Sequence, residues 1–110
     1  MTLIACWHHG NNTSITLSEF GHYYSMKAHF SKSKTKHLEE YMDEMIGTTG
    51  NTSFVNTNID GQIALDDHTV FYIKKYPGFI RIKLDKDENS DEAYYRIKSM
   101  CEGIKEVLAK

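Results

Sequence analysis

The sequence is short of proline, cysteine and long apolar runs, and each shortage excludes a class of protein. One proline and no low-complexity tract are typical of one continuous domain, and 110 residues are too few for two independent cores. No apolar run approaches the roughly 20 residues that cross a membrane. The first residues also lack the basic segment and the long apolar segment of a signal peptide. We therefore expect a cytoplasmic protein with one domain over residues 1–110 and no contact with a membrane.

The two cysteines, Cys6 and Cys101, stand far apart, whereas a disulfide-dependent secreted domain carries more cysteines at closer spacings. Both fall on apolar faces of predicted elements, which favours two buried thiols over a redox or catalytic role. Lys98 and Lys105 lie about one turn either side of Cys101 and leave a reactive thiol as the alternative.

The chain also lacks an excess of positive charge. Its 13 Lys and Arg residues stand against 15 Asp and Glu residues, which gives a formal net charge of −2. Proteins that bind nucleic acids usually carry a strong positive excess. The charge balance therefore predicts no direct contact with nucleic acid.

Apolar periodicity divides the chain into strands and helices. Alternating or β-prone segments predict strands at residues 3–7, 13–18, 24–30, 54–55, 63–65, 69–75 and 79–84. Apolar residues at spacings of three and four predict amphipathic helices at residues 36–46 and 91–108. The short connections between the later strands require antiparallel pairing. The order predicts an α+β fold in which both helices pack on one face of an antiparallel sheet of about six to seven strands.

Turn-forming residues separate these elements. Residues 10–12, 58–61 and 76–78 contain the Gly, Asn, Asp and Pro residues that favour tight turns. Gly47 stands where a glycine ends the first helix, whereas Gly103 lies inside the second helix and costs it stability.

Recognisable catalytic and metal-binding motifs are missing. The sequence has no phosphate-binding glycine loop and no Gly-x-Ser-x-Gly segment. None of its histidine pairs has metal-ligand spacing, although His8 and His22 would converge if the first two strands form a hairpin. The acidic segment that begins at Asp85 lacks the glycine and glutamate of a calcium loop. We therefore expect no metal, no cofactor and no enzyme activity.

Carboxylates and tyrosines remain as candidates for binding a partner. Acidic residues surround the start of the second helix and form a turn at residues 66–67, and an acidic surface speeds association with a basic partner. Tyrosines on polar faces or in turns are typical of protein interfaces. The predicted partner-binding residues are Asp66, Asp67, Tyr76, Asp85, Asp87, Glu88, Asp91, Glu92 and Tyr95.

Two further charged groups are weaker candidates. Glu39, Glu40, Asp43 and Glu44 are predicted on the solvent face of the first helix and offer a second acidic surface. Lys32, Lys34 and Lys36 precede that helix in a polar loop, where such lysines usually serve solubility.

The meander of residues 69–84, the acidic loop of residues 85–89 and the terminal helix of residues 91–108 resemble the small immunity proteins of bacterial toxin systems. These systems include contact-dependent growth inhibition, and the resemblance is one of size and architecture. It implies a cognate toxin, often a basic nuclease, that the chain binds tightly and blocks at or near its active site. It further implies a monomer within a heterodimer, in preference to a homo-oligomer.

Three other interpretations stay open. A phage-encoded inhibitor of a host defence protein would have the same architecture. A small histidine-dependent hydrolase or nuclease would use His29, His68 or His9, together with a lysine. A homo-oligomer would instead use an exposed edge of the sheet.

Overall fold

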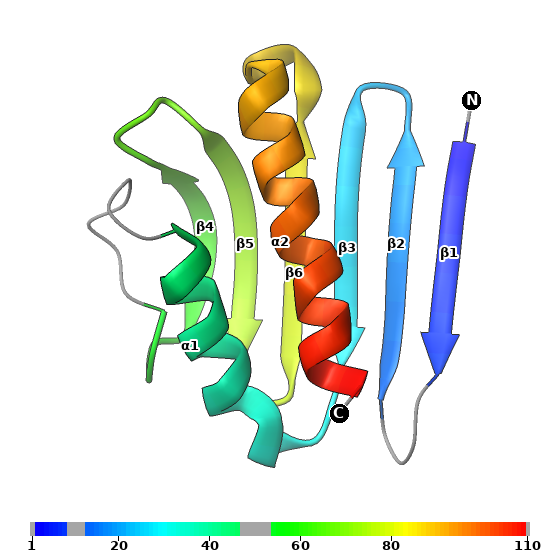
Figure 1. The fold of residues 1–110 in the computed structure, drawn as a ribbon, viewed down its shortest axis with the longest axis vertical. Helices are drawn as coiled ribbons and strands as arrows, with labels where there is room; N and C mark the ends of the chain where they lie inside the picture. The colour runs from blue at the N-terminus through cyan, green and yellow to red at the C-terminus, as the bar shows by residue number, and fades with distance from the viewer. Residues whose placement is uncertain (1, 9–12, 47–53, 110) are drawn as a thin grey trace.

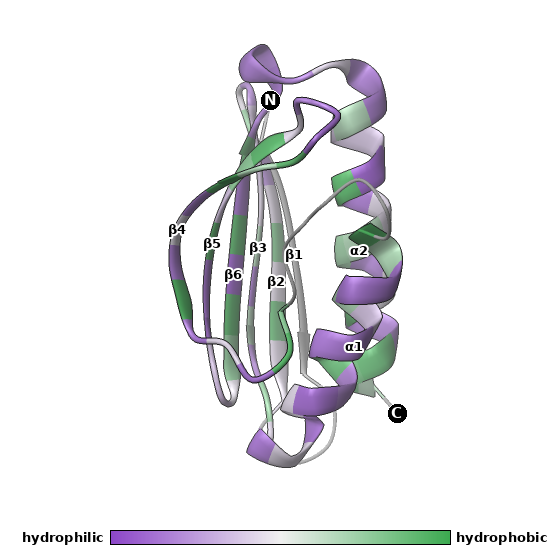
Figure 2. Ribbon diagram, turned by 90° about the vertical axis from the view of Figure 1, so that its left-hand side faces the viewer, coloured by the Kyte–Doolittle hydropathy of each residue, from purple (hydrophilic) through white to green (hydrophobic). Residues whose placement is uncertain are grey.

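A computed structural model describes residues 2–8, 13–46 and 54–109, and for residues 2–8 it describes the backbone alone. The fold is α+β, with one antiparallel sheet in the order β1-β2-β3-β6-β5-β4 and two described α-helices against one of its faces (Figures 1 and 2). The strands are β1 (Thr2–His8), β2 (Ser14–Phe20), β3 (Tyr23–His29), β4 (Ile59–Ala64), β5 (Val70–Tyr76) and β6 (Phe79–Asp85). The helices are α1 (Thr35–Ile46) and α2 (Asp91–Ala109), preceded by the 3-10 turns η1 (Lys32–Lys34) and η3 (Lys86–Glu88).

The order of elements repeats along the chain. Each half contains three antiparallel strands followed by a helix, and β3 and β6, the last strands of the two halves, pair antiparallel at the centre of the sheet. The two helices run in opposite directions, α1 over β4 and β5 and α2 over β6 and β3 (Figure 1). The repeat is one of topology, because the sequence of the first half does not recur in the second.

The core lies between the sheet and the two helices. Every second side chain of the central strands faces the helices, so Met26, Ile73 and Ile82 are buried. Ile97 and Ile104 of α2 pack against them, and Figure 2 shows apolar residues on the sheet-facing side of that helix. Burial of this apolar surface is the main favourable term in folding.

A buried ion pair joins α1 to β5. The ammonium nitrogen of Lys75 lies 2.5 Å from a carboxylate oxygen of Glu39, and the two side chains are 0% and 6% exposed. The other carboxylate oxygen of Glu39 accepts a hydrogen bond from the Asn56 N–H, and Lys75 also donates to the carbonyl of Thr57. The prediction that Glu39 faces solvent is therefore wrong, because its carboxylate balances a buried cation.

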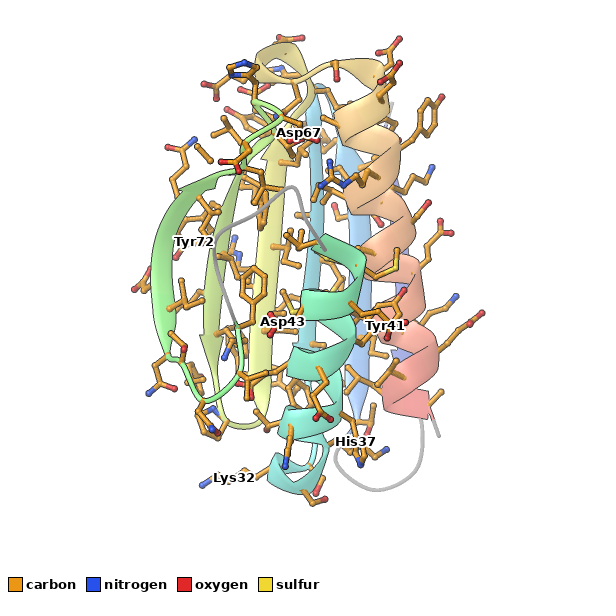
Figure 3. The ribbon with its side chains drawn as sticks, turned by 60° about the vertical axis from the view of Figure 1, so that its left-hand side comes forward. Lys32, His37, Tyr41, Asp43, Asp67 and Tyr72 are labelled. Atoms are coloured by element: carbon orange, nitrogen blue, oxygen red, sulfur yellow. The ribbon has the colours of Figure 1, made fainter. Side chains whose placement is uncertain are left out.

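The two helices approach each other closely at Gly103 in α2. A Cβ atom at this position would lie 1.7 Å from the hydroxyl oxygen of Tyr41 and 2.4 Å from the adjoining ring carbon. Figure 3 shows Tyr41 on the side of α1 that faces α2. Glycine thus leaves room for the tyrosine ring, which explains a residue that otherwise weakens a helix.

The structure confirms both predicted helices to within one residue at each end and corrects the strands. The predicted strand at residues 54–55 is wrong, because Phe54 is a buried core residue that leads into a turn, so seven strands overstated the count. Asp60 and Gly61 were expected in a turn but lie in β4, where Gly61 pairs with Ile73 of β5. Pairing of the whole of β4 with β5 outweighs the weak strand preference of these two residues. The predictions for residues 10–12 and for Gly47 lie outside the described residues.

Candidate interaction surfaces

Seven of the nine predicted partner-binding residues lie at one end of the molecule, which we call the acidic end. It consists of Asp66, Asp67, Asp85, Asp87, Glu88, Asp91 and Glu92. The β4–β5 turn, the end of β6, η3 and the start of α2 all lie at this end, at the top of Figure 1, and Figure 3 labels Asp67 there. All of these carboxylates except the half-buried Asp85 are exposed.

Asn89 fixes the two acidic segments relative to each other. Its side-chain oxygen accepts a hydrogen bond from the Val70 N–H at 2.8 Å, and its amide nitrogen donates to the Val70 carbonyl at 2.9 Å. The same nitrogen donates to the carbonyl of Asp85 at 2.8 Å. The hydrogen bonds of Asn89 therefore fix the start of β5 relative to the end of β6, and with them the two acidic segments.

Asp67 is anchored within the acidic end. Arg96 of α2 forms an ion pair with its carboxylate, and the Thr69 N–H donates to it at 3.1 Å. Desolvation by itself raises the pKa of Asp67, but the hydrogen bonds from Thr69 and the charge of Arg96 outweigh it and lower the pKa. The carboxylate is therefore negatively charged over the whole physiological range of pH.

The start of α2 has the expected cap. The hydroxyl oxygen of Ser90 accepts a hydrogen bond from the Ala93 N–H at 3.1 Å, which is the typical geometry of an N-cap. Asp91 and Glu92 follow in the first turn, where the helix dipole favours negative charge. Helix stability therefore accounts for part of the acidity at this end.

His22 joins the acidic end from the β2–β3 turn. Its Nε2 lies 3.8 Å from Asp85 Oδ1 and its Nδ1 lies 3.7 Å from Asp87 Oδ2, while its carbonyl accepts a hydrogen bond from the Lys86 N–H. One ligand atom from each of the three side chains lies within 4.8 Å of the others, a spacing that a cation would fit. Three ligands are fewer than the four of a structural zinc site, and the two ring nitrogens face different carboxylates. The sequence did not indicate this group, because the pairing of β3 with β6 and the hydrogen bond from the Lys86 N–H bring His22 to the two carboxylates.

Exposed aromatic side chains accompany the acidic end. Phe20 and Tyr23 pair across the β2–β3 hairpin and are 64% and 37% exposed, and Tyr23 is also in register with Asp85. Tyr95, 61% exposed, lies one turn after Asp91. The exposure expected for Tyr95 is confirmed, and Phe20 was missed because a lone phenylalanine before a turn carries no distinctive pattern.

Tyr76 lies apart from the other predicted residues. It ends β5 at the opposite end of the sheet, where its ring stacks on Phe79 with 4.9 Å between ring centroids. His29 also contacts Phe79, with centroids 4.9 Å apart. The interpretation that Tyr76 shares a surface with the acidic residues is therefore not supported.

The face of the sheet that points away from the helices, here the open face, carries a second surface that sequence reasoning missed. Lys27 of β3, Arg81 of β6 and Lys74 of β5 occupy one row across three neighbouring strands. All three are exposed, and among the described residues none of them forms an ion pair. The alternation within each strand was visible in the sequence, but the row depends on the pairing of β3 with β6.

Two shallow hollows flank Arg81 on the open face. One, of about 440 Å³, is lined by Arg81, Lys83, Tyr23 and Tyr72 among others. The second, of about 200 Å³, is lined by Arg81 and Lys27 among others. The Lys83 ammonium lies 4.4 Å from the centre of the Tyr23 ring. The Tyr72 hydroxyl donates to Asp60 at 2.7 Å, and Figure 3 labels Tyr72 on the strands well apart from the helices.

Within the part of the chain that the structure describes, the remaining candidates do not assemble into a reactive site. His29 ends β3, whereas His68 precedes β5 at the acidic end, so the two lie at opposite ends of the sheet, and His9 lies outside the described residues. Cys101 is buried as expected, and its burial raises the pKa of the thiol. Its neighbour Lys98 instead lies 3.5 Å from the Glu19 carboxylate. The side chain of Cys6 lies outside the described residues.

The α1 carboxylates and the preceding lysines are partly used within the fold. Asp43 accepts a hydrogen bond from the Phe54 N–H at 2.7 Å, and Lys34 donates to the Leu108 carbonyl at 2.7 Å.

Among the helices that the structure describes, none combines the length and the apolar character that crossing a membrane requires. Comparisons of the chain with protein-family models, curated proteins and solved structures found no match.

Proposed function

We propose that the chain is a non-catalytic inhibitor that neutralises a basic protein toxin, in the manner of an immunity protein. The acidic end covers the active site of the toxin, and a nuclease is the expected class because its active site is positively charged to hold nucleic acid. The observation that carries the proposal is the convergence at one end of seven carboxylates from two separate segments.

The acidic end has the chemistry of a protein-binding surface. Asn89 holds the backbone of its two segments together and Arg96 holds the Asp67 carboxylate, so binding costs little ordering of the backbone. Phe20, Tyr23 and Tyr95 lie around them, and exposed aromatic rings supply the apolar contacts that dominate binding energy in protein interfaces. Complementary charge raises the rate of encounter and selects the partner.

The α1 carboxylates fit this function less well. Glu39 is 4% exposed and bound to Lys75, and Asp43 holds the segment that begins at Phe54. Glu40 and Glu44 remain exposed on α1, which leaves a weaker acidic surface than the one around residues 85–92. They therefore offer a matched control for the test.

Co-expression with the product of the adjacent gene tests the proposal. We expect a stoichiometric complex on size-exclusion chromatography that survives moderate salt, and loss of the partner's nuclease activity on addition of the purified chain. The double variant Asp87→Lys/Asp91→Lys should slow association at least tenfold, because it replaces attraction by repulsion. Glu40→Lys/Glu44→Lys changes the net charge by the same amount and should leave binding within about twofold.

Other outcomes favour the alternatives. Equal losses for the two double variants would place the contact elsewhere, and a complex with a host defence protein would favour the phage inhibitor. A stable homo-oligomer without a partner would favour pairing of sheet edges. Hydrolysis by the purified chain that depends on a divalent cation, and disappears in His22→Ala, would favour an enzyme built on His22, Asp85 and Asp87.

A further inference from the structure

Lys27, Arg81 and Lys74 on the open face, which we call the cation row, lower the stability of the fold. Lys27 is in register with Arg81, and Arg81 is in register with Lys74. Side chains directly opposite on neighbouring antiparallel strands lie about 5 Å apart, and like charges at this distance destabilise the sheet. Asp60, which continues the row on β4, is bound by the Tyr72 hydroxyl. An arrangement that weakens the fold in this way is typical of a functional surface.

Aromatic side chains lie on both sides of the cation row. Tyr76, stacked on Phe79 and still 43% exposed, lies toward one end of the open face. Tyr72 and Tyr23 lie toward the other end and line the larger hollow together with Arg81 and Lys83. The Phe79 and Asp85 positions lie six residue steps apart along β6, a span of about 20 Å.

We propose that the open face binds single-stranded nucleic acid, with Lys27, Lys74, Arg81 and Lys83 against the phosphates and the tyrosine rings against the bases. Proteins that hold single strands without strict sequence preference combine a cationic surface with aromatic rings on which bases stack. A sheet with exposed rings suits single strands, because a duplex keeps the faces of its bases stacked inside. The larger hollow borders the acidic end, because Asp85 and Glu88 also line it, whereas Lys27, Lys74 and Arg81 lie farther along the strands. The proposal does not depend on the inhibitor function.

The open face is positively charged although the net charge of the chain is negative. The described open face holds four cations against Asp60 and Asp85, whereas α1 and α2 together hold eight carboxylates against four cations. The molecule is therefore polarised, with positive charge on the sheet and negative charge on the helices. The expectation of no contact with nucleic acid rests on the net charge, which averages the charges of these two layers. It does not take this local distribution into account.

Fluorescence anisotropy with labelled 12-nucleotide RNA and DNA of the same sequence tests the proposal on the purified chain. We expect micromolar binding at 50 mM salt, with a slope of log K against log salt of about −2 to −3 for three to four phosphate contacts. The triple variant Lys27→Ala/Lys74→Ala/Arg81→Ala should lose at least tenfold in affinity and most of the slope. Tyr76→Ala should weaken binding several-fold with the slope unchanged, because it removes stacking and no charge.

Lys36→Ala on α1 is the control, because this exposed lysine lies in the helix layer, and it should leave affinity within twofold. A thermal melt of each variant confirms folding. Tighter binding of RNA than of DNA would assign a role to the ribose hydroxyl. No binding of either strand at 50 mM salt overturns the proposal, as does competition by polyglutamate as effective as that by unlabelled oligonucleotide. Neither result bears on the inhibitor function, since Asp87→Lys/Asp91→Lys is tested separately against the toxin.

Discussion

The two faces of the sheet place neighbouring lysines of β5 in opposite settings. Lys75 faces the helices, is 1% exposed and binds Glu39, whereas Lys74 faces solvent and forms no ion pair with a described residue. A buried ammonium requires a partner because transfer from water costs several kcal/mol. An exposed one is solvated and can meet an anion from outside. Charge on the covered face therefore serves the fold, and charge on the open face is available for recognition.

Removal of Glu39 tests this difference with the largest expected change in stability. Glu39→Ala leaves the Lys75 ammonium buried without a counter-ion and should lower the free energy of unfolding by about 3–5 kcal/mol. Urea denaturation followed by far-UV circular dichroism measures the loss. Lys74→Ala, one residue away on the open face, should change the same quantity by less than about 0.5 kcal/mol.

A double variant separates lost charge balance from lost packing. Glu39→Leu/Lys75→Met removes both charges, and replacement of a buried ion pair by apolar residues is often neutral or stabilising. We expect it to recover most of the stability that Glu39→Ala loses. If it is as unstable as Glu39→Ala, the hydrogen bonds to Asn56 and Thr57 hold the structure more than the ion pair does.

The helix layer that covers the buried face depends on Gly103. In Gly103→Ala the new methyl group meets the hydroxyl, the ring carbon Cζ and the ring carbon Cε2 of Tyr41, so the whole ring must move. We expect a loss of about 1–3 kcal/mol, the usual cost of overpacking, in the same denaturation experiment. In a Tyr41→Ala background the substitution should instead stabilise by about 1 kcal/mol, because alanine is the better helix former. Equal effects in both backgrounds would contradict the steric explanation.

Periodicity predicted the elements that bury a full face. The spacing of Leu38, Met42 and Ile46 defined α1, and the alternation of Ile80, Ile82 and Leu84 defined β6. Edge strand β4 was placed poorly, because it contains Asp60 and Gly61 and its position follows from pairing with β5. Hydrogen bonds to the neighbouring strand decide the position of such a segment more than its own strand preference does.

The surfaces were predictable to the extent that they are local in the sequence. Residues 85–92 were recognisable as one acidic segment, and the turn at residues 66–67 as another, but their meeting depends on Asn89 and the strand order. The row of Lys27, Lys74 and Arg81 comes from three strands, two of them in the second half of the chain. A single sequence does not give the pairing of β3 with β6, so this row had no visible signal.

Replacement of Arg81 is the most specific test of the open face, and it has the smallest expected change in stability. Arg81→Thr replaces the middle cation of the row by a β-branched residue and relieves repulsion from Lys27 and Lys74, so it should raise the free energy of unfolding by about 0.2–1 kcal/mol. The gain should shrink in 0.5 M salt, because salt screens exposed charges. Lys83→Thr, two residues along β6, should bring no gain, because Lys83 lies opposite Ser25 and Tyr72 and contacts the Tyr23 ring. A salt-independent loss on Arg81→Thr would instead make Arg81 a structural residue, and the cation row would then serve the fold as Lys75 does.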